Sequence, residues 1–244
     1  MSCQLKSRRL LYNWLNNVQQ WLYPPRCTLC GDPGEGHYDL CYPCLTTLPF
    51  NLHPCHQCGL PLEGTDAHLC GRCLKKAPPF DSAVIPLLYQ PPLDRLILAL
   101  KFHQGLAHAR LLGQLLADAV EASDSRPQLI LPVPLHPGRL RERGYNQALE
   151  IARPIAKRLN IPLSLDLVQR TRSTETQTRL KYKERHKNMR GVFEVTRHVP
   201  PHVAIVDDVV TSSATVSALA KALRSAGAMQ VDIWAVARAP LRNR

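Results

Sequence analysis

The order of apolar and polar positions from residue 81 onward predicts strands and helices in alternation. Short apolar runs bounded by turn-forming residues indicate buried strands, which we expect near Ala83–Tyr89, Leu129–Pro134, Leu163–Val168, Val192–Val195, Val203–Val206 and Val231–Val236. Apolar residues spaced three and four positions apart indicate helices, which we expect at Leu93–Phe102, Leu106–Val120, from about Asn146 to Leu159, and at Ala214–Ala226. Because strands and helices alternate, residues 81–244 are expected to form an α/β domain with a mostly parallel sheet.

The first 25 residues carry a further helical pattern, separate from that domain. Its apolar positions share one helical face, and they are Leu11, Trp14, Leu15, Val18, Trp21 and Leu22. The polar face holds Asn and Gln rather than Lys, so we interpret residues 1–25 as an N-terminal amphipathic helix that packs on its own protein rather than on a membrane surface. No stretch approaches 18 consecutive apolar residues, and a membrane span is therefore not expected.

Residues 26–80 contain eight of the nine cysteines, arranged as an internal repeat. The pattern C-x-x-C-G-x-P-x-E-G starts at Cys27 and again at Cys55, and each copy closes with Leu-Cys-x-x-Cys-Leu. Thiolates spaced C-x-x-C bind tetrahedral Zn²⁺, and the Gly that follows tolerates a left-handed turn around the metal. We therefore predict a small double zinc ribbon with two structural ions, whose ligands are Cys27, Cys30, Cys41, Cys44, Cys55, Cys58, Cys70 and Cys73.

The spacing leaves the pairing of these ligands open. Sequential pairing places the first four cysteines on one ion and the last four on the other, whereas an interleaved arrangement pairs the two first knuckles with each other. Iron is the main alternative metal. Three histidines lie near enough in sequence to substitute as ligands, namely His53, His56 and His68, and Cys3 is left over. Since the cysteines come without an export signal, we expect a reducing, cytoplasmic compartment rather than disulfides.

Positive charge is concentrated in one stretch of the chain. The net charge is +12, from 31 Lys and Arg against 19 Asp and Glu. Residues 139–190 alone hold 14 basic and 5 acidic residues. A solvated helix face is the ordinary explanation of such a run, but its position between two strand patterns favours a surface that faces phosphate groups.

The segment Val203–Thr215 holds the most informative motif outside the cysteines. An apolar strand is expected to end in Asp207 and Asp208, and the hydroxyl-rich loop Thr211–Ser213 then opens a helix. Free N–H groups at a helix start, together with Thr and Ser hydroxyls, can bind a phosphate monoester. Two carboxylates just before that loop can accept hydrogen bonds from vicinal sugar hydroxyls. The segment indicates a site for a ribose 5-phosphate, against the plainer alternative of an acidic strand end and an ordinary helix cap.

This segment resembles the signature of type I phosphoribosyltransferases, in which Asp-Asp-Val-Val-Thr-Thr-Gly-x-Thr binds phosphoribosyl pyrophosphate (PRPP). Further motifs match a narrower group, and they are Leu100-Lys101-Phe102, Pro132-Val133-Pro134, Arg143-Gly144-Tyr145-Asn146-Gln147, and Arg170-Thr171-Arg172 followed by Thr176, Gln177, Arg185 and Asn188. Together with the cysteine repeat, they resemble the ComF/GntX family of competence-type phosphoribosyltransferase-like proteins over roughly residues 26–238. The resemblance implies a type I phosphoribosyltransferase-like fold of the α/β class in residues 81–244, preceded by the double zinc ribbon.

The resemblance also implies roles for particular residues. Asp207 and Asp208 would hold the ribose hydroxyls at the catalytic site. The 5-phosphate would be bound by Thr211, Ser212, Ser213 and Thr215. A pyrophosphate loop would follow the strand at 129–134, near Arg139, Arg141 and Arg143, and Mg²⁺ would accompany PRPP. Residues 170–190 would form the hood that closes over the site.

The loop departs from the family signature at two positions. Ser212 replaces the second Thr, and Ser213 replaces the Gly that lets the backbone approach the phosphate at unusual dihedral angles. A serine at that position must either accept strain or shift the loop, while it offers another hydroxyl. The departure affects phosphate affinity and any turnover.

Two functions follow from the resemblance and the charge. One is a protein of DNA uptake or utilisation in natural transformation, which binds PRPP and single-stranded DNA and works with other DNA-uptake proteins. The basic stretch 139–190, with Tyr145, Tyr182 and Phe193 in or near it, suits a single strand held by phosphate contacts and a few stacked bases. The alternative is an active phosphoribosyltransferase that transfers ribose 5-phosphate from PRPP to an acceptor that the sequence does not specify.

Overall fold

The computed structural model describes residues 26–34, 38–64, 67–102, 105–172 and 191–240. They fall into two compact units divided between Leu48 and Pro49, and each unit is described by itself. The helix predicted at 1–25, Cys3 and residues 173–190 of the predicted hood lie outside the described residues.

The first unit contains the first cysteine repeat and the short helix α2 (Tyr42–Thr46), which Cys41 precedes as N-cap. Gly31 follows the first knuckle with φ of +85°, the left-handed conformation that the C-x-x-C-G pattern predicts. Two backbone hydrogen bonds close the knuckle, from Gly31 N to Cys27 O (2.8 Å) and from Cys27 N to Asp32 O (2.7 Å).

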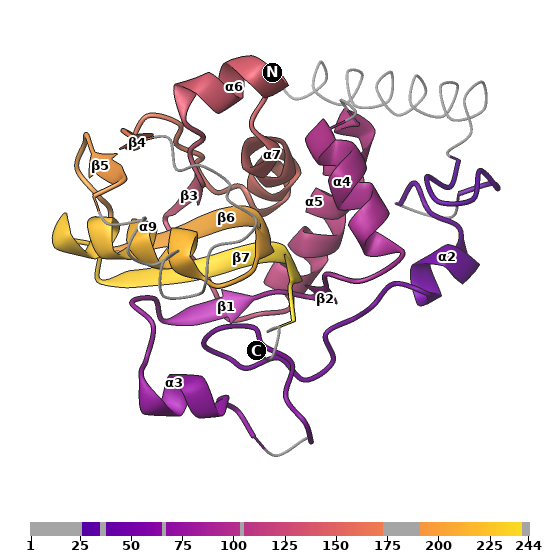
Figure 1. Ribbon diagram of the computed structural model, residues 1–244, viewed down its shortest axis with the longest axis horizontal. Coiled ribbons are helices and arrows are strands. Elements are labelled where there is room, and N and C mark those ends of the chain that lie inside the picture. Colours follow the sequence, from indigo (N-terminus) through magenta and orange to yellow (C-terminus); the bar gives the residue numbers. More distant parts are fainter. Residues whose placement is uncertain (1–25, 35–37, 65–66, 103–104, 173–190, 241–244) are drawn as a thin grey trace, which may run out of the picture. The chain divides into compact units, whose positions relative to one another are not determined.

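In the second unit, five parallel strands form one sheet (Figure 1). The path runs through β1 (Ser82–Val84), β7 (Gln230–Arg238), β6 (His202–Val210) and β3 (Leu129–Pro132), and β2 (Leu87–Leu88) also pairs with β7. The two central strands, β6 and β7, are buried along most of their length, as strands covered on both faces are. The prediction of a mostly parallel α/β sheet is confirmed.

Helices cover both faces of this sheet, and the longer ones are α4 (Leu93–Phe102), α5 (Leu106–Glu121), α7 (Gln147–Leu159) and α9 (Ala214–Ser225). Ile205 of β6 and Ile233 of β7 share a hydrophobic core with residues of α9. The next residue along β7, Trp234, donates its indole N–H to Ser125 Oγ (3.2 Å) just beyond the end of α5. Because successive strand side chains point to opposite faces, α9 covers one face and α5 the other (Figure 1).

Helices α5 and α7 pack closely because a glycine meets a proline. A Cβ on Gly113 of α5 would lie 2.4 Å from Cγ of Pro154 and 2.6 Å from the carbonyl oxygen of Ile151, both in α7. Only glycine permits this approach, since a side chain there would force the backbone of α7 to move. Pro154 lies inside α7, within the helix that the sequence predicts from about Asn146 to Leu159.

The second cysteine repeat belongs to the same unit as the sheet. Its short helix is α3 (Gly71–Lys75). Several of its residues are buried in the hydrophobic core that includes Phe80 and Ile85, and these are Cys55, Cys58, Leu60 and Cys73. A Cβ on Gly59 would lie 2.6 Å from Cδ1 of Ile85, so the knuckle lies directly against the segment that follows β1. This ribbon is therefore part of the core of the α/β unit.

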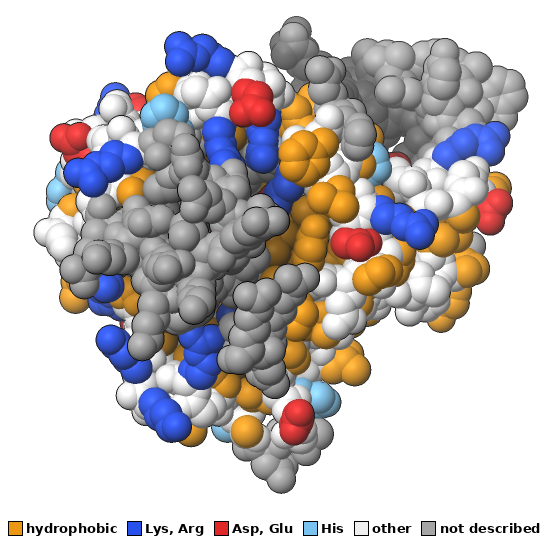
Figure 2. All heavy atoms as spheres, in the orientation of Figure 1, with side chains coloured by type: hydrophobic (Ala, Val, Ile, Leu, Met, Phe, Trp, Pro, Cys, Tyr) orange, Lys and Arg blue, Asp and Glu red, His pale blue; other side chains and the backbone are white. Residues whose placement is uncertain are grey.

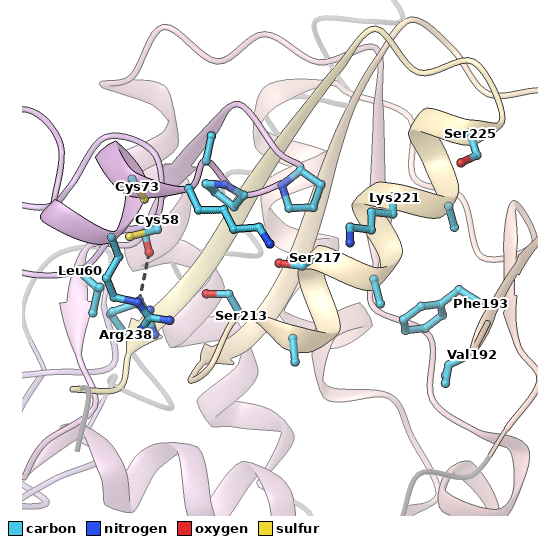
Figure 3. A pocket seen from close by; sticks show the side chains of 18 of the residues that line it. Cys58, Leu60, Cys73, Val192, Phe193, Ser213, Ser217, Lys221, Ser225 and Arg238 are labelled. Atoms are coloured by element: carbon cyan, nitrogen blue, oxygen red, sulfur yellow. Dashed lines mark hydrogen bonds between the residues drawn. The ribbon is translucent and has the colours of Figure 1, made fainter. Parts of the chain in front are cut away.

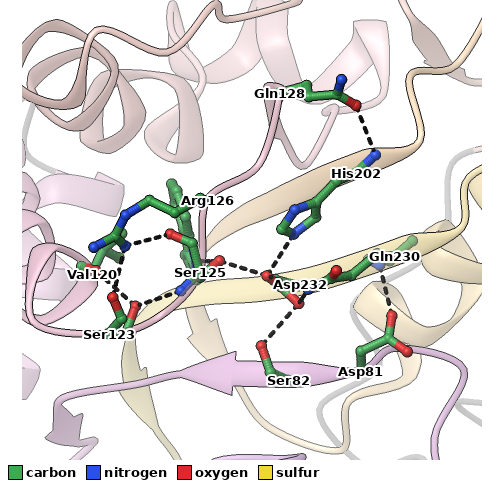
Figure 4. A network of polar contacts seen from close by, with 12 residues as sticks. Asp81, Ser82, Val120, Ser123, Ser125, Arg126, Gln128, His202, Gln230 and Asp232 are labelled. Atoms are coloured by element: carbon green, nitrogen blue, oxygen red, sulfur yellow. Dashed lines mark hydrogen bonds and ion pairs between the residues drawn. The ribbon is translucent and has the colours of Figure 1, made fainter.

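A buried carboxylate joins the amino ends of three neighbouring strands (Figure 4). Asp232 of β7 is fully buried. It accepts hydrogen bonds from Ser82 of β1 (2.9 Å), from Ser125 (2.5 Å) and from Nε2 of His202 in β6 (2.7 Å). A buried carboxylate is tolerated only when its oxygens are satisfied in this way, so the network holds the strands in register at this edge.

Several elements differ from the sequence prediction, and the single strand predicted near Ala83–Tyr89 is two short strands, β1 and β2. Strand β6 continues to Val210, because its last residues pair with β7, and Asp207 and Asp208 therefore lie inside the strand. Strand β4 (Val168–Arg170) begins where the predicted strand ends, and it pairs antiparallel with β5 (Phe193–Val195). Helix α6 (Pro137–Arg143) has no buried residue, so the apolar pattern gives no sign of it.

Candidate functional site

The acidic pair lies near the carboxyl end of β6, at the edge of the sheet where α/β proteins bind ligands. Asp207 is half-buried and Asp208 is buried. Oδ1 of Asp207 accepts a hydrogen bond from the backbone N–H of Asp208 (2.9 Å), and Oδ1 of Asp208 accepts one from that of Val209 (2.7 Å). The backbone thus orients both carboxyl groups.

Lys101, in the last turn of α4, forms an ion pair with Asp208. Its Nζ lies 2.8 Å from Oδ2 of Asp208, and the two side chains are 24% and 12% exposed. Burial by itself lowers the pKa of Lys101, but the carboxylates of Asp208 and Asp207 outweigh it, and the pKa is raised above the ordinary value. Lys101 therefore stays charged beside the acidic pair.

The two carboxyl groups influence each other electrostatically. Burial is the largest cause that raises the pKa of Asp207 to about 8, and the neighbouring carboxylate of Asp208 adds to it, while Lys101 opposes it. Asp207 therefore holds its proton more tightly than an ordinary aspartate does, and it lies beside the ion pair of Asp208 with Lys101. Such a pair can both donate hydrogen bonds to and accept them from vicinal hydroxyl groups.

Arginines also lie within electrostatic reach of Asp207. Burial lowers the pKa of Arg170 in β4, the charge of Arg139 in α6 lowers it further, and the carboxyl group of Asp207 raises it. The guanidinium of Arg170 also lies 5.8 Å from the centre of the Phe193 ring. Figure 2 shows Lys and Arg side chains gathered over the region of α6. Cations are thus available at this edge of the sheet for an anionic ligand.

The hydroxyl-rich loop connects β6 to α9. Ser213, the N-cap of α9, has φ of +61° and ψ of +8°, a left-handed conformation that is strained for serine. Its side chain makes no capping hydrogen bond, while Oγ of Ser212 accepts a long one from Ala214 N (3.4 Å). The loop therefore keeps the backbone that the family signature assigns to glycine, and the serine accepts the strain.

A buried arginine donates hydrogen bonds to the backbone at the start of this loop. Arg238, at the end of β7, is 2% exposed. Its guanidinium donates hydrogen bonds to the carbonyl oxygens of Val210 (2.6 Å), Thr211, and Cys58 of the second ribbon (3.0 Å), the last of which Figure 3 shows. Arg238 thus links the zinc knuckle to the start of the candidate phosphate loop.

The segment Arg143–Gln147 has a structural role. Gly144 ends α6 with φ of +79°, and Asn146 caps α7 by accepting a hydrogen bond from Ala148 N (3.1 Å). The hydroxyl of Tyr145 donates to the carbonyl oxygen of Leu100 in α4. Arg143, a predicted phosphate ligand, lies with its guanidinium 5.6 Å from the centre of the Phe102 ring, beside the end of α4 that carries Lys101.

The eight thiols of the two repeats gather in two groups of four. One group contains Cys27, Cys30, Cys41 and Cys44, and the other contains Cys55, Cys58, Cys70 and Cys73. Within each group all sulfur atoms lie within 4.8 Å of one another. This is the sequential arrangement rather than the interleaved one.

The geometry of both groups fits zinc. The Sγ atoms of Cys30 and Cys41, and those of Cys58 and Cys70, are 3.6 Å apart. Tetrahedral Zn²⁺ with Zn–S bonds of about 2.3 Å requires sulfur atoms roughly 3.8 Å apart. Four thiolates complete the coordination of each ion, so both sites support structural Zn²⁺ and leave no open position for catalysis.

Two cations of the site were not among the predicted site residues. Lys101 belongs to a motif of the family resemblance, but its pairing with Asp208 depends on the fold. Arg238 follows an apolar strand in sequence, where an arginine usually reaches solvent. The available signal was position, since Lys101 and Arg238 are the last charged residues of α4 and β7.

Known proteins match this chain in two ways, through the cysteine repeat and through similarity over most of its length. A double zinc ribbon domain model matches residues 18–74. DNA utilization protein YhgH of Shigella flexneri is 37% identical over 225 residues, which cover 88% of this chain and 97% of that protein. Competence protein F of Haemophilus influenzae is 35% identical over 227 residues, with the same coverage of both chains. Among the described residues, no helix has the length and apolar character needed to cross a membrane.

Proposed function

Because this chain belongs to the ComF/GntX family, with DNA utilization protein YhgH and competence protein F among its relatives, we propose that it is a phosphoribosyltransferase-like protein of DNA uptake or utilisation that binds PRPP. The acidic pair inside β6, followed directly by the left-handed loop and α9, is the observation that carries this proposal. In the proposed complex with PRPP, Asp207 and Asp208 bind the ribose hydroxyls.

The rest of the PRPP molecule fits the neighbouring groups. The 5-phosphate is bound by the loop residues Thr211, Ser212, Ser213 and Thr215, where the first turn of α9 offers backbone N–H groups. The pyrophosphate, with Mg²⁺, faces the cations contributed by α4, α6 and β4, which are Lys101, Arg139, Arg143 and Arg170. Charge complementarity of this kind supports binding of a polyanion.

Calorimetric titration of PRPP with Mg²⁺ tests this site on Asp207→Asn and Asp208→Asn variants. Each variant keeps the shape of the side chain but loses an ionisable acceptor, so the affinity for PRPP should fall by about tenfold or more. Asp124→Asn, at an exposed carboxylate, serves as the control and should bind as the parent does. Absence of PRPP binding by the parent, or unchanged affinity in both variants, rejects the assignment.

Single-stranded DNA is the second ligand of this proposal. The basic stretch 139–190 supports it, because 14 Lys and Arg residues can release counterions from a nucleic-acid backbone. The relatives' names associate them with competence and DNA utilisation, and other DNA-uptake proteins are proposed partners on the same basis.

An active phosphoribosyltransferase is the alternative. The cations around the acidic pair favour it, since their positive charge is already oriented and can stabilise the pyrophosphate that leaves. Release of pyrophosphate from PRPP and Mg²⁺, measured with and without single-stranded DNA, separates this enzyme from a protein that only binds PRPP.

A further inference from the structure

A cavity of about 1100 Å³ lies between the second ribbon and α9 (Figure 3). Its ribbon side includes Arg72, Lys76, Pro78 and Pro79. Its α9 side includes Ser213, Ser217, Lys221 and Ser225, and Val192 and Phe193 contribute near β5. Ligand pockets usually measure about 300 to 1,000 Å³, so this cavity can hold more than one nucleotide-sized group.

The described residues that line the cavity include cations but no carboxylate. Four of them are basic, namely Arg72, Lys76, Lys221 and Arg238, and none is Asp or Glu. Cys58 and Cys73 also line it, and a zinc ion with four thiolates carries two net negative charges. The net charge that the cavity presents to a ligand therefore depends on how many of the four cations are balanced by the zinc site.

The two arginines offset the zinc site. Arg238 donates a hydrogen bond to the carbonyl oxygen of Cys58 (3.0 Å), and Arg72 lies between the ligands Cys70 and Cys73 in sequence. Both arginines therefore adjoin the zinc ligands, Arg238 through this hydrogen bond and Arg72 through its place in the sequence. Their two positive charges match the two negative charges of the zinc site, which leaves the charges of Lys76 and Lys221 to face the cavity.

Lys76 and Lys221 are available to a ligand. Both are exposed, and neither forms an ion pair with another described residue. Figure 3 shows the amino group of Lys221 directed into the space beside Ser217. Around these charges, most of the lining surface is apolar, and it includes Pro78, Pro79 and the ring of Phe193.

We propose that this cavity binds a short segment of single-stranded DNA, with phosphates beside Lys76 and Lys221 and base faces against the apolar walls. Cationic groups next to apolar and aromatic surfaces are what proteins use to bind single strands without base preference. This inference rests on the DNA-binding part of the proposed function, and it assigns the second ribbon a direct part in that binding, since the ribbon supplies Lys76.

The test measures fluorescence anisotropy of a labelled oligo-dT with the full-length, zinc-loaded protein. The double variant Lys76→Ala/Lys221→Ala should lose two phosphate contacts. Each contact to a single strand contributes a log–log salt slope of about −0.7, so the slope should become shallower by about 1.4 and the affinity at 0.1 M salt should fall by about 25-fold. Lys75→Ala/Arg110→Ala removes the same charge from exposed positions outside the cavity and should change little.

A second variant tests the cavity without changing its charge. Ser225 is exposed at the rim, and Ser225→Trp should lower DNA affinity by filling the space. PRPP titration of all variants should match the parent. If the parent binds no oligonucleotide, the DNA partner of the proposed function fails, and this inference with it. Parent-like affinity and slope in the Lys76/Lys221 variant, or an equal loss in the Lys75/Arg110 variant, overturns the cavity assignment alone.

Discussion

Ser213 stands where the resembled signature has glycine, and its φ of +61° keeps the left-handed backbone of that position. A non-glycine residue in this conformation costs about 1–2 kcal/mol, part of which glycine gives back through its greater freedom in the unfolded chain. Loops that bind ligands often keep strain of this size. Ser213 therefore keeps the backbone conformation expected for the glycine of the signature, although the residue differs.

Ser213→Gly should stabilise the protein by about 1 kcal/mol, because glycine adopts this conformation without the steric cost. Denaturant unfolding with zinc present measures the change. Ser212→Gly is the matched control, since Ser212 is not at a positive φ and should gain nothing. A Ser213→Gly variant that is no more stable than the parent contradicts strain at this position.

Asp207 makes stability depend on pH. Its pKa is raised to about 8 in the folded protein, above the ordinary value of 3.8. The folded state therefore holds this proton more tightly than the unfolded state, and the stabilisation is lost as pH rises through about 8.

Asp207→Asn should remove that dependence, because the amide stays neutral. As pH rises from about 6.5 to about 9, the melting temperature of the variant should increase relative to that of the parent. The zinc thiolates stay deprotonated over this range. Asp124→Asn, at an exposed carboxylate, controls for net charge. A constant difference between Asp207→Asn and the parent across this range speaks against a raised pKa.

At the scale of elements, the two zinc ribbons are alike locally and differ in what their cysteines contact. Gly59 and Gly31 both follow a knuckle with positive φ, and each donates its N–H to the first cysteine of its repeat. The second ribbon belongs to the core of the α/β unit, and there Cys58 accepts a hydrogen bond from Arg238, which also supports the candidate phosphate loop.

Cys73→Ser and Cys44→Ser occupy equivalent positions in the two repeats and form a matched pair. Each should lower the zinc content from about two to about one ion per chain, measured by elemental analysis. Cys73→Ser should also lower the melting temperature of the α/β unit and weaken PRPP binding, because it disturbs the knuckle that Arg238 holds. Equal PRPP affinity in the two variants contradicts this coupling.

At the scale of the whole molecule, the groups that form the candidate site come from distant parts of the chain. Lys101 lies in α4, Arg170 in β4, and Asp208 in β6. They meet near the carboxyl end of β6, the only one of these elements that belongs to the parallel sheet, and the Asp232 network aligns the strands at the opposite edge. The site therefore depends on strand register throughout the second unit.

The sequence by itself determined the local features. Hydrophobic periodicity reports which residues are buried, and it located the longer helices α4, α5, α7 and α9 and the central strands to within a few residues. The repeated C-x-x-C-G pattern identified the eight ligand cysteines, since residues close in the chain form each knuckle. The Asp-Asp and hydroxyl-rich loop could be recognised because the whole motif is contiguous.

Only the tertiary structure decided the contacts between distant segments, including the sequential grouping of the knuckles. Periodicity does not say which element a buried face meets, so the pairing of Lys101 with Asp208 and the burial of Arg238 beneath Thr211 could not be foreseen. The same holds for α6, whose exposed, basic residues carry no apolar signal, and for the cavity beside α9. Long-range packing brings these groups together, and it is encoded in the whole chain rather than in any one segment.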